Sequence, residues 1–435
     1  MLAPRLAALD LLTDCLQDGV TLDAAVARHI TQSALPPRDR AFARALATTA
    51  LRRRGDLLTC LRHLLDRPLP KRAGIAARCL ELGLTQVLFL DVADHAAVDT
   101  TLRLLDRRGR AGDKPLKGLL NAVLRRAARE REDMLARLEA DPATNLPGWL
   151  RKGWTHSYGA AATADMARLL RHEPPLDLTP RDPTDAAALA EAIGAGMLPC
   201  GSLRFARTVD PATLPGFAEG RFWVQDASAA LPARLLISQL PPGAPVIDIC
   251  AAPGGKTLQL AAAGCAVTAL DKSDSRLDRL RDNLVRTGLQ AEVITADALG
   301  WRPAGPAAGV LLDAPCSATG TLRRRPDVAW SKSVRDVRSL ADLQARLLAA
   351  AAAMVAPGGT LVYCVCSLQP EEGEDRIAAF LDARSDWARV PIAADELPGL
   401  EAARTKDGDL RILPVHLADA GGIDGFYAAR CARKR

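Results

Sequence analysis

The chain has 435 residues, of which 49% are hydrophobic and 25% are charged, and its formal net charge is +6. This length exceeds what one compact core usually holds, so we expect two or three domains. The longest apolar run, residues 347–356, is about half of the roughly 20 residues that a membrane-spanning helix needs, which excludes a membrane span.

The positive charge is concentrated in the first third of the chain. Residues 1–145 hold 24 Lys and Arg against 18 Asp and Glu, whereas the remainder holds 33 of each kind. A basic first domain suggests an acidic partner such as nucleic acid. Arginine far outnumbers lysine and alanine is abundant, so the nucleotide composition of the genome is an alternative explanation.

The ten cysteines contain no C-x-x-C pair, so we predict no zinc or other metal site and no disulfide framework. Reduced thiols fit a reducing compartment. Asp10 and Asp14 interrupt the apolar stretch of residues 1–16, which a secretory signal would not allow. We therefore expect a cytoplasmic protein that does not associate with membranes.

Residues 1–142 predict an all-α domain. Apolar residues recur there at helical spacing, and proline- and glycine-containing breaks at residues 36–37, 68–70 and 109–115 divide the stretch into several short helices. Residues 143–232 predict a small α/β connector, with a helix over residues 186–193.

Residues 233–435 predict a Rossmann-like domain, because short apolar runs alternate there with helical segments. Strands that alternate with helices are typical of a doubly wound, mostly parallel sheet. The five predicted strands are residues 246–249, 266–270, 291–295, 310–312 and 361–365.

A glycine turn follows the first of these strands, in residues 248–257. Glycines allow a ligand to approach the backbone closely, and the helix that begins there offers free N–H groups to a carboxylate or phosphate. The turn is not a phosphate-binding P-loop, because Cys250 stands where that motif needs glycine. A tight connection without a ligand is the alternative.

Acidic residues end the next two strands. Asp271 lies where a carboxylate can accept hydrogen bonds from a ribose diol, and Asp297 ends the third strand. Each could instead cap a helix, since Asp favours that position. Together with the turn they favour an adenosine-type ligand at the carboxyl edge of the sheet.

Two cysteines follow the fourth and fifth strands, in Asp313-Ala314-Pro315-Cys316 and in Cys366-Ser367. Carbon 5 of cytosine is a poor nucleophile, so an enzyme must first add a thiolate to carbon 6 and later remove the carbon 5 proton. Asp313 is placed to hydrogen-bond the ring nitrogen. Buried cysteines are otherwise often inert small hydrophobes, which is our expectation for three others: Cys250, Cys265 and Cys364.

Residues 223–430 resemble the catalytic domain of the Nol/Nop/Sun family of RNA cytosine-C5 methyltransferases. The matching pieces are residues 225–228, 248–257, 313–320, 323–327, 366–367 and 424–427. This resemblance implies that Cys366 is the covalent nucleophile and that Cys316 assists release of the product. Two departures from the family pattern, Arg325 for a common histidine and Val365 for a common threonine, remove no catalytic group.

The resemblance also implies that S-adenosylmethionine is the cofactor. Its contacts carry over to the following residues: Cys250, Ala251, Ala252, Pro253, Gly254, Gly255, Lys256, Asp271, Asp297 and Asp313. Cys364 forms an unusual C-x-C with the nucleophile, and because alternate strand residues share a face it could lie near Cys366. A redox role for Cys364 therefore stays open.

The first domain resembles the NusB-like RNA-binding fold in residues 6–12, 38–42 and 116–126. A NusB-like domain ahead of this catalytic domain is similar to the bacterial RsmB subgroup, whose substrate is a cytosine of 16S (small-subunit) ribosomal RNA. We expect free or partly assembled rRNA as the partner, because the target base must be unpaired to be reached, and we expect a monomer. The alternatives are the same chemistry on transfer RNA and a non-catalytic rRNA assembly factor.

Aromatic residues make up only 4% of the chain, so we expect arginines to supply most RNA contacts. The candidates are Arg125 and Arg126 in the first domain, and Arg323, Arg324 and Arg325 beside the predicted active site. Ordinary solvated charges are the alternative interpretation of these residues.

Overall fold

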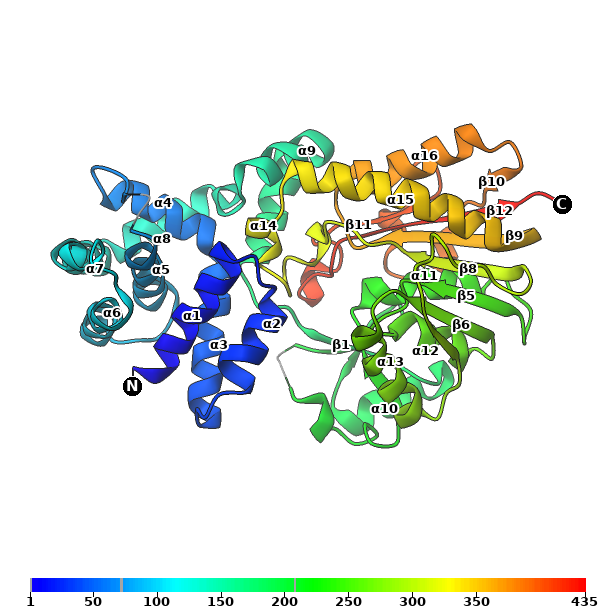
Figure 1. Ribbon diagram of the computed structural model, residues 1–435, viewed down its shortest axis with the longest axis horizontal. Coiled ribbons are helices and arrows are strands. Elements are labelled where there is room, and N and C mark those ends of the chain that lie inside the picture. Colours follow the sequence, from blue (N-terminus) through cyan, green and yellow to red (C-terminus); the bar gives the residue numbers. More distant parts are fainter. Residues whose placement is uncertain (1, 71–72, 207–208) are drawn as a thin grey trace. The chain divides into compact units, whose positions relative to one another are not determined.

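The computed structural model describes residues 2–70, 73–206 and 209–435, and its elements fall into two units (Figure 1). Unit 1 comprises Met1–His172 and Leu322–Ser333. Unit 2 comprises Glu173–Thr321 and Val334–Arg435. The chain therefore passes from one unit to the other after His172, after Thr321 and after Ser333.

Unit 1 is helical, which confirms the all-α prediction for the first part of the chain. It extends beyond the expected boundary at residue 142, because α9 also belongs to it. Its helices are α1 Ala3–Gln17, α2 Leu22–Val26, α3 Pro37–Arg52, α4 Arg54–Leu64, α5 Gly74–Phe89, α6 Asp94–Arg108, α7 Lys117–Arg129, α8 Arg131–Ala140, α9 Gly148–Leu170 and α14 Val328–Ser331.

Helix α5 forms the centre of unit 1. It is apolar on nearly all sides, and Leu80, Leu82 and Leu84 are fully buried in a core of leucine and alanine side chains. A helix that is hydrophobic all round must be covered on all sides by other helices. The helices around it have narrower apolar faces; in α7, Leu120, Val123, Leu124 and Ala127 are buried at helical spacing.

The segment Leu322–Ser333 joins unit 1 although it follows residue 321 of the catalytic part. The backbone N–H of Leu22 donates to Asp327 Oδ2 (3.1 Å), and Trp330 Nε1 donates to the carbonyl of Leu51 (3.2 Å). The Arg54 guanidinium lies 4.7 Å from the centre of the Trp330 ring, a cation–π contact. These contacts attach α14 to α2, α3 and α4.

Unit 2 begins with a small antiparallel sheet of order β2-β3-β1-β4. Its strands are β1 Leu176–Pro180, β2 Gly196–Met197, β3 Leu203–Phe205 and β4 Phe222–Val224. Helix α10 spans Ala186–Ile193, the residues predicted for it. A buried ion pair between Arg204 and Asp177 (2.7 Å) joins β3 to β1.

The large sheet of unit 2 has the order β10-β12-β9-β8-β5-β6-β7, with β11 paired to β12. The strands from β9 to β7 are parallel to one another, and β12 is antiparallel to β9. The strands are β5 Pro245–Ile249, β6 Ala266–Asp271, β7 Glu292–Thr295, β8 Ala307–Asp313, β9 Val355–Val365, β10 Trp387–Arg389, β11 Leu410–Ile412 and β12 Phe426–Arg433.

Helices cover both faces of this sheet, and alternate strand residues serve the two faces. Leu312 and Tyr363 pack with Leu347 of α15 (Val334–Met354), whereas Leu311 and Val362 pack with Leu235 of α11 (Ala227–Ile237). Figure 1 shows α15 and α16 (Glu374–Ala383) on one side of the sheet and α12 (Gly255–Ala262) and α13 (Asp274–Thr287) on the other. The doubly wound, mostly parallel fold is confirmed.

Among the helices of the described residues, none is both long and apolar enough to cross a membrane.

Candidate active site

The predicted site residues follow strands that are neighbours in the large sheet. Strands β6, β5, β8 and β9 are adjacent and parallel, with Ile249 paired to Leu312 and Asp313 paired to Cys364. Their carboxyl ends therefore lie along one edge of the sheet, which is where doubly wound folds bind ligands. The glycine turn and both cysteine-bearing loops leave from this edge.

The turn after β5 requires its glycines. Gly254 has φ +110°, and a Cβ there would lie 2.5 Å from Leu280 Cδ1. A Cβ on Gly255, the first residue of α12, would lie 3.1 Å from Gln225 Cδ. Cys250 also has a positive φ, 63°, which is uncommon for a residue with a side chain. The turn is thus tightly packed on its protein side.

Asp248 lies beneath this turn and is fully buried. Thr257 Oγ1 donates to its Oδ2 (2.6 Å), while Oδ1 has no hydrogen-bond partner among the residues that the structure describes. Burial raises the pKa of Asp248 to about 7, although the Thr257 hydrogen bond acts in the opposite direction. A buried acceptor without a donor is suited to a ligand that brings one.

Lys256 and Asp313 form an ion pair, with 2.7 Å between Lys256 Nζ and Asp313 Oδ2. Burial lowers the pKa of the Lys256 ammonium, but the charge of Asp313, its hydrogen bond and the other acidic groups nearby together outweigh burial, and the pKa is raised. The same ammonium lies 5.3 Å from the centre of the Phe426 ring. Lys256 thus joins the glycine turn to the end of β8.

Asp271 supports the turn from β6. Its carboxylate accepts hydrogen bonds from the backbone N–H groups of Ala252 (3.3 Å) and Ser273 (3.0 Å), and Arg276 lies at 3.4 Å. The Ser273 bond agrees with the alternative that Asp271 caps a helix. Asp297 is exposed and accepts from the N–H of Leu299 (2.9 Å).

A cavity of about 200 Å³ lies between the glycine turn and the end of β8. Seven of its lining residues come from the strands and the turn: Asp248, Ala251, Ala252, Pro253, Gly255, Lys256 and Asp313. Four residues that were predicted to contact the cofactor do not line the cavity, within the part of the chain that the structure describes. They are Cys250, Gly254, Asp271 and Asp297.

The rest of the cavity lining comes from a segment that the sequence analysis does not predict as a site. Val224, Gln225, Asp226 and Ala229 line it. The Gln225 amide donates to Gln259 Oε1 of α12 (2.9 Å), and its carbonyl accepts from Trp223 Nε1 (2.8 Å). The signal in the sequence is the stretch of residues 225–228, which matches the family pattern.

Cys316 and Cys366 meet at the carboxyl edge, with 3.5 Å between their sulfur atoms. Both side chains are half-buried. The pKa of Cys316 is raised well above its usual value, first by the hydrogen bond with Cys366 and then by burial. Cys316 therefore remains a thiol that can donate to Cys366.

Cys364 is fully buried, and its sulfur lies 3.7 Å from Asp313 Oδ1. Burial raises the pKa of the Cys364 thiol well above its usual value, and burial also raises that of Cys250, to about 12. Thiols held in this way are poor nucleophiles at neutral pH.

The predicted RNA-contacting arginines differ in exposure. Arg125 is exposed on α7 and donates to Asn121 Oδ1 (3.1 Å), while Arg126 is half-buried and pairs with Glu130 (2.8 Å). Arg323 is only 1% exposed, and Arg324 and Arg325 are half-buried. Arg125 therefore has the most accessible charge of the five.

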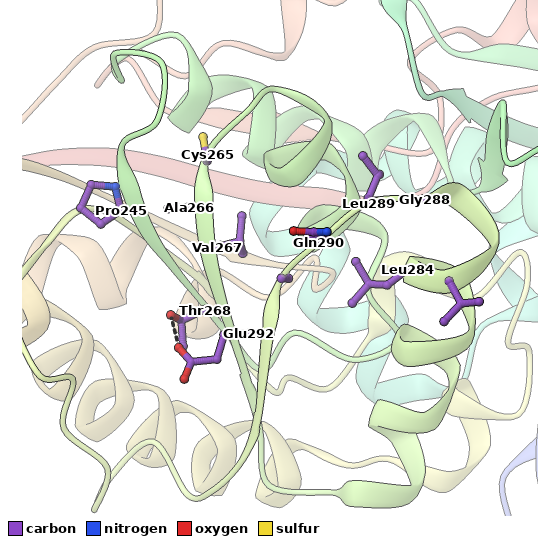
Figure 2. A pocket seen from close by; sticks show the side chains of 12 residues that line it. Pro245, Cys265, Ala266, Val267, Thr268, Leu284, Gly288, Leu289, Gln290 and Glu292 are labelled. Carbon is purple, nitrogen blue, oxygen red and sulfur yellow. Dashed lines mark hydrogen bonds between the residues drawn. The ribbon is translucent and has the colours of Figure 1, made fainter.

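A larger hollow of about 930 Å³ lies at the other end of the sheet. Figure 2 shows it, with a hydrogen bond between Thr268 and Glu292 (3.0 Å). Its lining comes from the amino-terminal parts of β5, β6 and β7, near Pro245 and Cys265, and from the end of α13. It is thus remote from the carboxyl edge where the cysteines meet.

Comparison with known proteins assigns the two parts of the chain to families. Residues 237–432 match the family model of the 16S rRNA methyltransferases RsmB/F, and residues 2–129 match that of the NusB family. The ribosomal RNA small subunit methyltransferase B of Pseudomonas putida is 39% identical over 98% of this chain and 98% of its own. Its counterpart in Xanthomonas campestris is 38% identical over 90% of each chain.

Solved structures support the fold. PH0851 has a TM-score of 0.74 with 21% identity and covers 99% of both chains. NSun6 from Pyrococcus horikoshii, solved with SFG, has a TM-score of 0.55 with 18% identity and covers 66% of this chain and 98% of its own. The family models and the sequence relatives show that the chain belongs to the RsmB/F family of 16S rRNA methyltransferases and carries a NusB-family domain in its first part.

Proposed function

We propose that this chain methylates carbon 5 of a cytosine in 16S ribosomal RNA, with S-adenosylmethionine as methyl donor and Cys366 as covalent nucleophile. The observation that carries the proposal is the 3.5 Å approach of Cys316 and Cys366 at the carboxyl edge of the sheet. A thiol beside a second thiol suits a reaction that must add a sulfur to a ring and later remove it.

The residues around the 200 Å³ cavity fit the proposed cofactor. Asp248 lines this cavity, and its Oδ1 is a buried acceptor that lacks a donor within the described part of the chain. An ammonium group such as that of the methionine moiety would supply the donor. Asp271 lies outside the lining of this cavity and supports the turn from behind, because its carboxylate accepts from the backbone N–H groups of Ala252 and Ser273. When bound, S-adenosylmethionine supplies an electrophilic methyl group.

The chain's own residues carry the other steps. The thiolate of Cys366 adds to carbon 6, and the electron pair of the 5,6 double bond makes carbon 5 nucleophilic. In this proposal Asp313, which pairs with Lys256 at 2.7 Å, accepts a hydrogen bond from the ring nitrogen once that nitrogen carries a proton in the adduct. After methylation a base takes the carbon 5 proton, the electron pair of that carbon–hydrogen bond re-forms the 5,6 double bond, and the sulfur–carbon 6 bond breaks with its electrons returning to Cys366. Cys316 assists this release.

The roles of the two cysteines can be separated by alanine variants. With naked 16S rRNA and radiolabelled S-adenosylmethionine, C366A should transfer no methyl group, whereas C316A should accumulate protein covalently bound to RNA on a denaturing gel. C265A is the matched control, because Cys265 is another half-buried thiol but lies at the opposite end of the sheet. Loss of adduct in C316A and its retention in C366A would reverse the assigned roles.

The transfer assay tests one alternative function, and mapping of modified cytosines in a deletion strain tests the other. A non-catalytic assembly factor would bind rRNA but give neither transfer nor adduct with the wild-type protein. A transfer RNA methyltransferase would leave 16S rRNA unmodified in both the presence and absence of the gene. Mapping 5-methylcytosine in 16S rRNA and in tRNA from a deletion strain should show the loss of a site in 16S rRNA alone. The names of the curated relatives, small subunit methyltransferase B, favour this outcome.

A further inference from the structure

Glu372 is a fully buried acid that neither the sequence motifs nor the proposed mechanism uses. It ends the short 3-10 turn Pro370–Glu372, which follows β9. Its Oε1 accepts hydrogen bonds from the backbone N–H of Ser317 (2.8 Å) and from Gln344 Nε2 (3.0 Å). Its Oε2 accepts from the hydroxyls of Ser317 and Ser367, the latter at 2.6 Å.

The two serines that Glu372 binds are the residues that directly follow Cys316 and Cys366. Their hydroxyl oxygens are 3.1 Å apart, so one carboxyl group holds both at once. Thr319 extends the cluster: its hydroxyl lies 3.2 Å from that of Ser367 and accepts from the N–H of Leu368 (3.0 Å). The loop after β8 and the loop after β9 are thereby joined at the positions next to their sulfur atoms.

Other contacts of Glu372 fix its own position. Gln344 of α15 also donates to the carbonyl of Pro315 (2.9 Å), and the Tyr363 hydroxyl donates to the backbone carbonyl of Glu372 (2.6 Å). Tyr363 is fully buried in β9. The acid is thus anchored by a helix and a strand of the sheet. A buried carboxyl group whose two oxygens each accept two hydrogen bonds favours one conformation, because any other would leave these oxygens and their donors unpaired.

We propose that Glu372 is a positioning residue that fixes the spacing of Cys316 and Cys366 by binding the serine after each of them. With the sulfurs held 3.5 Å apart, the cysteine that assists release is already in place when the nucleophile has added to the base. The effect on product release rests on the proposed function. The fixed spacing of the two sulfurs, which is the geometric part of the proposal, does not. Glu372 is not part of the cofactor cavity lining, as far as the described residues define it.

The geometric part can be tested without RNA or cofactor by thiol–disulfide exchange. Two thiols give up two protons and two electrons to glutathione disulfide, which becomes two molecules of glutathione, and a Cys316–Cys366 disulfide forms. The equilibrium constant measures how favourably the protein holds the two sulfurs together. Peptide mapping by mass spectrometry follows this pair among the ten cysteines.

E372Q keeps the size of the side chain but replaces one acceptor oxygen by an amide. We expect the exchange equilibrium constant to fall at least about tenfold, since a lost buried acceptor is worth a factor of this order. E81Q is the matched control: Glu81 is also buried, 1% exposed, but it pairs with Arg54 and Arg78 in unit 1. E81Q should leave the equilibrium within twofold of wild type, whatever it does to thermal stability.

The catalytic part is tested with 16S rRNA. E372Q should lower kcat, leave the KM for S-adenosylmethionine unchanged and accumulate part of the covalent adduct, because the release step loses its aligned partner. A merely structural role would reduce the amount of active enzyme without accumulating adduct. If wild-type protein and C316A both fail to form adduct, the proposed function fails, and the exchange measurement still decides the role of Glu372.

An exchange equilibrium for folded E372Q within twofold of wild type would overturn the proposal. Should E372Q fail to fold, the double variant S317A/S367A removes the two hydroxyl donors and leaves the acid in place. It should lower the equilibrium constant in the same direction, and an unchanged value would overturn the proposal equally.

Discussion

Asp248 shows how a single buried acid makes stability depend on pH. Burial raises its pKa to about 7 from the value of 3.8 that it has in an unfolded chain. At a pH between these two pKa values, Asp248 keeps its proton in the folded protein but has released it in the unfolded chain. The free energy of unfolding therefore falls as the pH rises from about 4 to about 7.

We predict that D248N removes this part of the pH dependence. Relative to wild type, the variant should gain stability steadily between pH 4 and 7, by at most about 4 kcal/mol for a shift of roughly three pKa units. Urea unfolding at several pH values measures the difference. D297N, at an exposed carboxylate, is the control and should show no comparable gain. A difference between D248N and wild type that does not vary with pH would contradict the prediction.

Also at the scale of residues, the sequence predicts where some residues of the candidate site lie but not where others do. The approach of Cys316 to Cys366 could be predicted, because both lie within three residues of the end of a strand and the carboxyl ends of neighbouring parallel strands meet at one edge. The catalytic roles of these cysteines and of Asp313 stay predictions. Gln225 and Glu372 could not be predicted, because their roles depend on contacts with residues 34 and 55 positions away. Arg323 was expected to contact RNA, but a pattern of charges does not reveal that its side chain is buried.

At the scale of elements, the glycine turn and helix α12 form one structural piece. Gly254 combines φ +110° with a Cβ direction that points into Leu280 of α13. An alanine there would have to move either the turn or that helix, and the turn forms part of the lining of the 200 Å³ cavity.

We predict that G254A weakens the binding of S-adenosylmethionine by at least about tenfold and lowers the free energy of unfolding by about 2 kcal/mol, through backbone strain and overpacking. Isothermal calorimetry and urea unfolding measure the two effects. G264A is the control, because Gly264 has φ +78° but open space around its Cβ. It should lose about 1 kcal/mol of stability from strain alone and keep its affinity. Equal losses of affinity in both variants would argue against a specific role of the turn.

The five parallel strands and the helix at residues 186–193 could be predicted from apolar runs and breakers, since these signals are local. Strands β10, β11 and β12 were not predicted. β12 is buried along most of its length, so it has no alternation of polar and apolar residues, and its antiparallel place beside β9 depends on pairing with distant residues. Short apolar runs of this kind do not distinguish a strand from a buried helix segment.

At the scale of the whole molecule, the excess positive charge lies in the first third of the chain. If Arg125 binds an RNA phosphate, R125Q should reduce the slope of log affinity against log salt concentration by about 0.7 to 0.9, the contribution of one phosphate contact. Filter binding of 16S rRNA at several salt concentrations measures the slope. R168Q is the control, because Arg168 is an exposed arginine of α9 already paired with Glu139 and Asp165. An unchanged slope in R125Q would remove Arg125 from the RNA-binding surface.

Unit 1 also depends on the segment Leu322–Ser333 for part of its structure. Trp330 is half-buried, donates to the carbonyl of Leu51 and lies against Arg54. We predict that W330A lowers the free energy of unfolding of unit 1 by about 2 kcal/mol, less than for a fully buried tryptophan. Hydrogen exchange in α3 and α4 should increase in this variant. S331A, at the exposed neighbour, should leave it unchanged, and protection in W330A equal to wild type would contradict the prediction.

The interrupted course of unit 1 has a consequence for how the protein is made. A ribosome releases the chain from its amino terminus onward, and domains generally fold as soon as all their residues have emerged. Most of unit 1 precedes unit 2 in this sequence, but its last piece, Leu322–Ser333, is translated only after residues 173–321 of unit 2. Until then the helices of unit 1 lack the contacts that this segment provides. A pause or truncation before codon 333 should therefore leave both units incomplete.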